Sequence, residues 1–202
     1  MNCRFPDFFD EIPSFVVRDP LAEFLGAAED GLIEYRFADA VRLAGHSCPT
    51  VAGAWLMTTR ALRRLYGDDV PERGAVDVAF AATQAEGVTG VIASVVTLLT
   101  GAAGNGGFKG LAGRFSRRDL LAFAVPGIEE IRFTRRDSGA SVSIGLDLSP
   151  VGGDPRMGQL LPALLSGQGS VADARLFGQL WQGRVRSILV DHHDDPRLTP
   201  MR

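Results

Sequence analysis

The residues best suited to chemistry are His46 and Cys48, which lie two positions apart in the run Gly-His-Ser-Cys-Pro-Thr at residues 45–50. Proline is favoured at the first position of a helix, since it has no N–H to leave unpaired. Cys48 is therefore predicted to be the N-cap of a helix that begins at Pro49. The free amides and positive dipole at that end favour the thiolate. A thiolate near an imidazole can bind a zinc-type metal ion.

A metal centre needs more ligands than this pair provides, because a catalytic zinc site normally uses three protein ligands and a water molecule. We expect Glu86 to complete the site. The other candidates that the sequence leaves open are Asp39, Glu34, His192 and His193. A metal-free interpretation uses the same atoms, with Cys48 as a nucleophilic thiol activated by the helix end and by His46.

The glycine-rich segment at residues 101–113 raises the question of phosphate binding. It fits neither standard pattern, because Lys109 stands where the dinucleotide fingerprint needs a third glycine and no Ser or Thr follows that lysine. We predict a loop whose backbone closely approaches another group, with the site at Cys48 as one candidate. Lys109 and Arg114, each next to a glycine, are predicted to bind an anionic substrate through their charges.

The hydrophobic pattern predicts helices at residues 49–66 and 88–100 and strands at 74–83, 108–115, 128–136 and 142–148. A short helix is possible at 117–124, and helices are predicted at 157–165 and 171–189, followed by a loose polar tail. This order is typical of an α+β fold in which helices cover one face of a mixed sheet. We expect one α+β domain over residues 1–150, which includes an N-terminal arm anchored by Phe8, Phe9 and Phe15. Residues 151–202 would form a C-terminal helical extension packed on the same core, with Trp181 closing the core or a dimer contact.

Composition excludes several classes of partner. Hydrophobic residues make up 46% of the 202-residue chain and charged residues 22%, which is ordinary for a globular protein. The formal net charge of -3 gives no general attraction to nucleic acid or to anionic lipid. No run approaches the roughly 18 apolar residues that a membrane span requires, and the acidic, proline-containing start does not resemble a signal peptide. We therefore expect a cytoplasmic protein with Cys3 and Cys48 reduced.

The stretch GHSCPTVAGAWLMTTRAL resembles the Gly-His-x-Cys-Pro signature of the FmdE-like family, which is named after a component of formylmethanofuran dehydrogenase. The similarity extends over residues 35–123, through the following strand, the GVTGVIASVVTLLTGAAG helix and the FKGLAGRF segment. The resemblance implies an α-β-α-β-β-β core like the catalytic domain of glyceraldehyde-3-phosphate dehydrogenase. It also implies a homodimer and a zinc-type site that uses His46 and Cys48.

Three positions depart from the archaeal members of that family. Where those members have further cysteine or aspartate residues, this chain has Val91, Ser94 and Ala102. The function we expect is that of an FmdE-like, zinc-type metal-binding protein that acts on or carries a small anionic or one-carbon compound. The alternatives are a non-enzymatic accessory or cofactor-handling subunit and a metal-free thiol enzyme that uses Cys48, so the sequence leaves open whether the protein is an enzyme.

Overall fold

The computed structural model describes residues 4–202, so Cys3 and the first residues of the arm lie outside the described part. A four-stranded mixed sheet stands at its centre, in the order β4-β3-β5-β6. The strands are β3 (Val76–Phe80), β4 (Leu121–Ala122), β5 (Ile131–Arg135) and β6 (Ser141–Ile144). β3 runs parallel to β4 and antiparallel to β5, which is antiparallel to β6. With α3 (Pro49–Tyr66) and α4 (Thr89–Thr100) the order is α-β-α-β-β-β, which confirms the predicted α+β fold.

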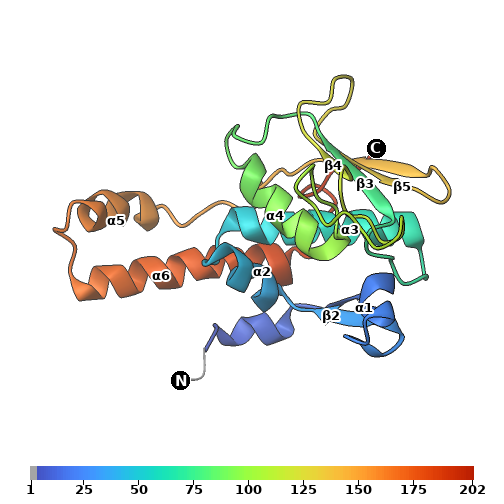
Figure 1. The fold of residues 1–202 in the computed structure, drawn as a ribbon. Coiled ribbons are helices and arrows are strands. Elements are labelled where there is room, and N and C mark those ends of the chain that lie inside the picture. The colour runs from blue at the N-terminus through green and yellow to red at the C-terminus, as the bar shows by residue number, and fades with distance from the viewer. Residues whose placement is uncertain (1–3) are drawn as a thin grey trace.

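One face of the sheet is buried and the other is not. Val76, Val78 and Phe80 alternate with more exposed residues along β3, and Ile131 and Phe133 do the same along β5. Since successive side chains point to opposite faces of a strand, this pattern places one apolar face against a covering layer. Helix α3 packs against β5, β6 and α4, and so supplies that layer (Figure 1).

Helix α3 begins and ends where the sequence predicts. Pro49 is its first residue, Cys48 is the N-cap and Gly67 is the C-cap. Its central residues are almost all buried, including Val51, Trp55 and Leu62, because the helix lies between the sheet and the other helices.

The N-terminal segment that precedes α3 consists of short elements of regular structure. It comprises a 3-10 turn (Asp7–Glu11), β1 (Phe15–Arg18), α1 (Pro20–Phe24), a second 3-10 turn (Glu29–Gly31), β2 (Leu32–Tyr35) and α2 (Phe37–Ala44). β1 and β2 pair as an antiparallel ribbon that sequence analysis did not predict. The anchoring role of Phe8, Phe9 and Phe15 is confirmed, since all three side chains are buried.

The C-terminal helices α5 (Arg156–Leu165) and α6 (Val171–Arg186) form a hairpin that projects from the body (Figure 1). No residue of α5 is buried. The attachment to the core comes from Val185 at the end of α6 and from Ile188 and Leu189 in a short π-helical turn (Ser187–Asp191). In the described part of the chain, no helix is both long and apolar enough to cross a membrane.

Three local predictions were wrong. Residues 108–115 form turns with one isolated bridge between Leu111 and Arg114 instead of a strand, because five of residues 110–119 have positive φ and cannot extend. Residues 117–124 contain the short strand β4 and no helix. The tail is not loose, because its backbone pairs with residues 143–147 and the side chain of Leu198 is fully buried.

Candidate functional site

The turn that carries His46 and Cys48 connects α2 to α3. Gly45 closes α2 with φ 75°, a left-handed conformation that suits glycine and turns the chain toward the next helix. His46 is exposed, whereas Cys48 is only 9% exposed. The Sγ atom of Cys48 accepts the backbone N–H of Val51 at 3.5 Å, so the sulfur lies at the positive end of the 18-residue helix α3.

One nitrogen of the His46 ring is held by the backbone. The Nδ1 atom lies 2.9 Å from the carbonyl oxygen of Ala44. Since a carbonyl only accepts, this contact assigns the proton of the neutral ring to Nδ1 and leaves the lone pair on Nε2. A backbone carbonyl that orients a histidine in this way is the usual outer partner of a metal-binding imidazole.

Helix α6 fixes the middle of the turn through Ser47. The carbonyl oxygen of Ser47 accepts hydrogen bonds from Trp181 Nε1 at 3.0 Å and from Gln182 Nε2 at 3.2 Å. The Ser47 hydroxyl donates to Gln182 Oε1 at 3.0 Å. Sequence analysis placed Trp181 at the core or a dimer contact and missed Gln182 altogether. No local signal could reveal these contacts, because Trp181 and Gln182 follow Ser47 by 134 and 135 positions in the chain.

The other predicted metal ligands are engaged elsewhere. The exposed carboxylate of Glu86 accepts the backbone N–H of Thr83 at 3.3 Å. The remaining candidates each contact a charged neighbour: Asp39 with Arg42, Glu34 with Arg36, His192 with Asp195, and His193 with Asp194. Within residues 4–202 no three His, Cys, Asp or Glu side chains gather closely enough to hold a metal ion. The imidazole of His46 and the thiol of Cys48 are both donors that zinc accepts.

Lys109 and Arg114 belong to the glycine-rich loop but lie in different surroundings. Both are exposed, and the guanidinium of Arg114 sits 4.7 Å from the centre of the Phe115 ring. Arg114 lines a cleft of about 480 Å³, and Lys109 does not. The cleft is lined by Pro20, Glu72, Arg73, Gly74, Gly113, Arg114, Phe115, Ser116, Arg117 and Arg136. This lining contains none of His46, Cys48 and Glu86, so the structure groups Arg114 with other arginines instead of with the turn.

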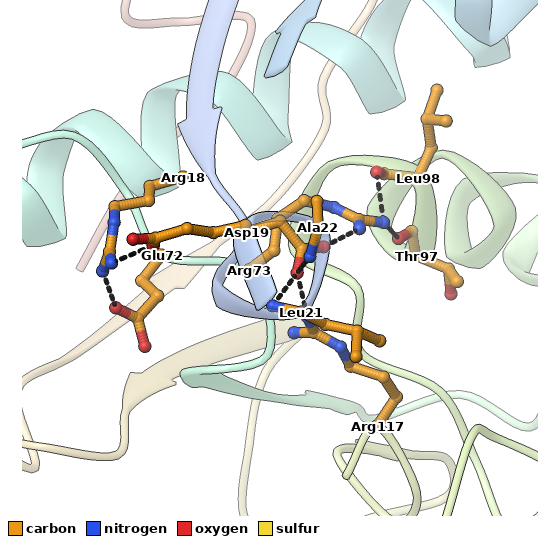
Figure 2. Close-up of polar contacts among 10 residues, drawn as sticks. Arg18, Asp19, Leu21, Ala22, Glu72, Arg73, Thr97, Leu98 and Arg117 are labelled. Atoms are coloured by element: carbon orange, nitrogen blue, oxygen red, sulfur yellow. Dashed lines mark hydrogen bonds and ion pairs between the residues drawn. The ribbon is translucent and has the colours of Figure 1, made fainter. Parts of the chain in front are cut away.

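A buried carboxylate pairs with two of the arginines that line this cleft. Asp19 lies between Arg73 and Arg117 (Figure 2), with Oδ2 2.5 Å from Arg73 Nη1 and Oδ1 2.6 Å from Arg117 Nη2. The same carboxylate caps α1 by accepting the backbone N–H groups of Leu21 and Ala22. Burial alone would raise the pKa of Asp19, but the charges and hydrogen bonds of the two guanidinium groups and the cap outweigh burial and lower that pKa.

Both arginines are placed by backbone features. Arg73 donates to the carbonyl oxygens of Thr97 and Leu98 at the end of α4 (Figure 2). Arg117 passes over Gly74, where an added Cβ would stand 1.6 Å from its Nη1 atom. Gly74 also has φ 83°, so glycine is required at this position for both space and conformation. Arg117 is buried, although arginine side chains are mostly exposed.

The loop that carries Arg114 is conformationally strained. Ala112, Phe115 and Asp119 all have positive φ although none is glycine. Each such residue costs about 1–3 kcal/mol, and such residues cluster at functional sites. The glycines of this loop permit close approach to the loop's own backbone. An added Cβ at Gly107 would meet the carbonyl oxygen of Arg117, and one at Gly110 would meet that of Arg114. Cys48 is not among these contacts.

Comparison with known proteins returns a distant similarity to a solved structure. No family model matches the sequence, and no curated protein matches it. Among solved structures, the chain is similar to a tungsten formylmethanofuran dehydrogenase FmdE-like protein from Syntrophus aciditrophicus, with 16% sequence identity and a TM-score of 0.41. The match covers 83% of this chain and 71% of that chain. At this identity and TM-score the match carries no inference about function, which is argued below from the residues of this chain.

Proposed function

We propose that the protein binds a zinc-type divalent metal ion at residues 45–48 through His46 Nε2 and Cys48 Sγ. The observation that carries the proposal is the 2.9 Å contact of His46 Nδ1 with the Ala44 carbonyl oxygen, which leaves Nε2 as the free donor. The position of Cys48 at the start of α3 supports it, because cysteine sulfur is a ligand that zinc accepts and this sulfur lies at the positive end of the helix.

Two protein donors leave coordination positions open. Water, an oxygen of a small anionic or one-carbon compound, or the same residues of a second copy in a homodimer would fill them. Glu86 would join only by releasing the backbone N–H of Thr83. A bound ion with open positions would polarise a carbonyl group or activate water. The contribution of the chain is to hold the two donors in place through Ala44 and through the Ser47 contacts with α6.

Metal analysis of the purified protein tests the proposal. We expect bound zinc in the wild type and its loss in His46→Ala and in Cys48→Ser, since serine keeps the N-cap but removes the thiolate. His193→Ala is the matched control, because that ring contacts Asp194 instead of the turn, and it should retain the metal. One ion per chain indicates a site within each chain, and one per two chains indicates a shared site. A metal-free wild type, or metal retained in both site variants, contradicts the proposal.

The alternative functions separate in the same experiment. Cys48 Sγ at the N-terminus of an 18-residue helix favours a metal-free reactive thiol as the second candidate. A wild type without metal whose Cys48 is rapidly alkylated by iodoacetamide near neutral pH would support that candidate. Metal bound without any turnover would support the non-enzymatic accessory or cofactor-handling role.

A further inference from the structure

The arginine-lined cleft is a second candidate site, separate from the metal site proposed above. Four guanidinium groups and a single carboxylate, that of Glu72, contribute to its lining. They come from the loops before β3 and β4 and from the end of β5, so segments distant in sequence converge on one concave surface. A cleft of about 480 Å³ accepts a small molecule, not merely an ion.

The carboxylates around the cleft leave positive charge uncompensated. Arg73 and Arg117 share the single carboxylate of Asp19. Glu72, the one carboxylate of the lining, pairs with Arg18 at 3.3 Å. Arg18 is not one of the four arginines that line the cleft, so Glu72 does not neutralise any of them. In the described part of the chain, Arg73 Nε is also buried without a hydrogen-bond partner. The arginines of the cleft therefore have more N–H donors than the surrounding carboxylates can accept from.

Arg114 and Arg136 are the groups free to turn toward a ligand. Arg114 forms no ion pair within residues 4–202 and lies against the Phe115 ring, which holds its charge at the rim of the cleft. Arg136 has one carboxylate partner, Asp77, at 3.5 Å with both side chains about half exposed. An exposed pair at this distance contributes little and is easily exchanged for a better anion.

We propose that this cleft binds the phosphate group of a small phosphomonoester. A phosphate dianion carries more negative charge and more acceptor oxygens than a carboxylate, so it can accept hydrogen bonds from several guanidinium groups that approach from different directions. The Ser116 hydroxyl adds a neutral donor, and Pro20 and Phe115 give an apolar wall for the rest of the ligand. The backbone on both sides of Arg114 is strained, with positive φ at Ala112 and Phe115.

Isothermal titration calorimetry with the full chain tests this site, using inorganic phosphate and glycerol phosphate as probes at constant ionic strength. We expect saturable binding of both, tighter for glycerol phosphate, and at least a tenfold weaker affinity in Arg114→Gln because a charge-assisted contact is lost. Lys109→Gln is the matched control, since it removes one positive charge from the same loop outside the cleft. Its affinity should be unchanged.

Three results would overturn the proposal. They are no binding of either phosphate compound at millimolar concentration, equal losses in Arg114→Gln and Lys109→Gln, and tighter binding of succinate than of glycerol phosphate. The metal content of Arg114→Gln should equal that of the wild type, so the anion site and the metal site can fail independently. Circular dichroism of both variants verifies that the fold is retained.

Discussion

The carboxylate of Asp19 bonds the guanidinium of Arg117 at 2.6 Å across 98 positions of the chain. This contact joins the N-terminal ribbon to the glycine-rich loop, and Arg73 extends the connection to the end of α4 (Figure 2). The three side chains therefore hold together segments that the central sheet does not link. Two members of this network, Arg73 and Arg117, also line the arginine cleft.

Asp19→Asn is expected to lower the free energy of unfolding by about 3 kcal/mol, because it leaves the buried guanidinium of Arg117 and the partly buried one of Arg73 without their counter-charge. Urea denaturation at pH 7 measures the change. Asp154→Asn is the control, since that carboxylate lies in an exposed pair with Arg156 and its loss should cost less than about 1 kcal/mol. Equal effects of the two substitutions would contradict a special role for Asp19.

The stabilisation by Asp19 should depend on pH in a defined direction. The pKa of Asp19 is lowered in the folded protein from an ordinary value of 3.8, so the folded state favours the ionised form. The contribution is complete above that ordinary value and is lost as the pH falls through the lower folded pKa. The stability difference between the wild type and Asp19→Asn should therefore be constant from pH 7 to pH 5 and shrink below pH 4. A difference that stays constant down to pH 2 would show that ionisation of Asp19 is not its source.

Gly74→Ala should destabilise the protein by at least about 2 kcal/mol, since it combines an unfavourable φ with the displacement of Arg117. Gly26→Ala separates the two causes. Gly26 also has a positive φ, but an added Cβ there meets nothing within 4 Å. This control should cost only about 1–2 kcal/mol. Thermal and urea unfolding measure both variants, and a Gly74→Ala cost no greater than that of Gly26→Ala would contradict the described position of Arg117.

Gln182→Ala should weaken zinc binding by about tenfold, because it removes both Gln182 contacts with Ser47 between the two proposed ligands. The fold should survive, since Trp181 still donates to the Ser47 carbonyl oxygen. Gln179→Ala, on an exposed position of the same helix, is the control and should bind zinc like the wild type. Competition with a chromophoric chelator measures both affinities. An unchanged affinity in Gln182→Ala would mean that α6 does not position the turn.

Sequence analysis succeeded where the signal is local. Cys48, Pro49 and Gly67 mark the ends of α3 by N-cap, first-turn and C-cap preferences that act within one helical turn. Helices α3 and α4 and strands β3, β5 and β6 follow from hydrophobic periods that each element carries within itself, whereas the two-residue strand β4 was not predicted. The Asp19-Pro20 pair offered a similar local cue, an N-cap before a first-turn proline, and would have identified Asp19 as a capping residue.

The predictions that failed depend on contacts between residues that are distant in the sequence. The tail looked polar and loose because its order comes from pairing with residues 143–147 and from burial of Leu198, neither of which is visible in the tail itself. The cleft was not predicted for the same reason. Of the four arginines in the cleft, only Arg114 was predicted to bind an anion. The positions of Arg73 and Arg117 depend on Asp19 and on the space above Gly74, which the sequence does not reveal.

Titration of the metal-free protein with cobalt(II), followed by absorption spectroscopy, tests the central claim most directly. Cobalt occupies zinc sites and reports a bound thiolate through a sulfur-to-metal charge-transfer band. We predict that this band appears in the wild type, disappears in Cys48→Ser and weakens strongly in His46→Ala, while His193→Ala retains it. A wild type without the band, or a band that persists in Cys48→Ser, would contradict metal binding at His46 and Cys48.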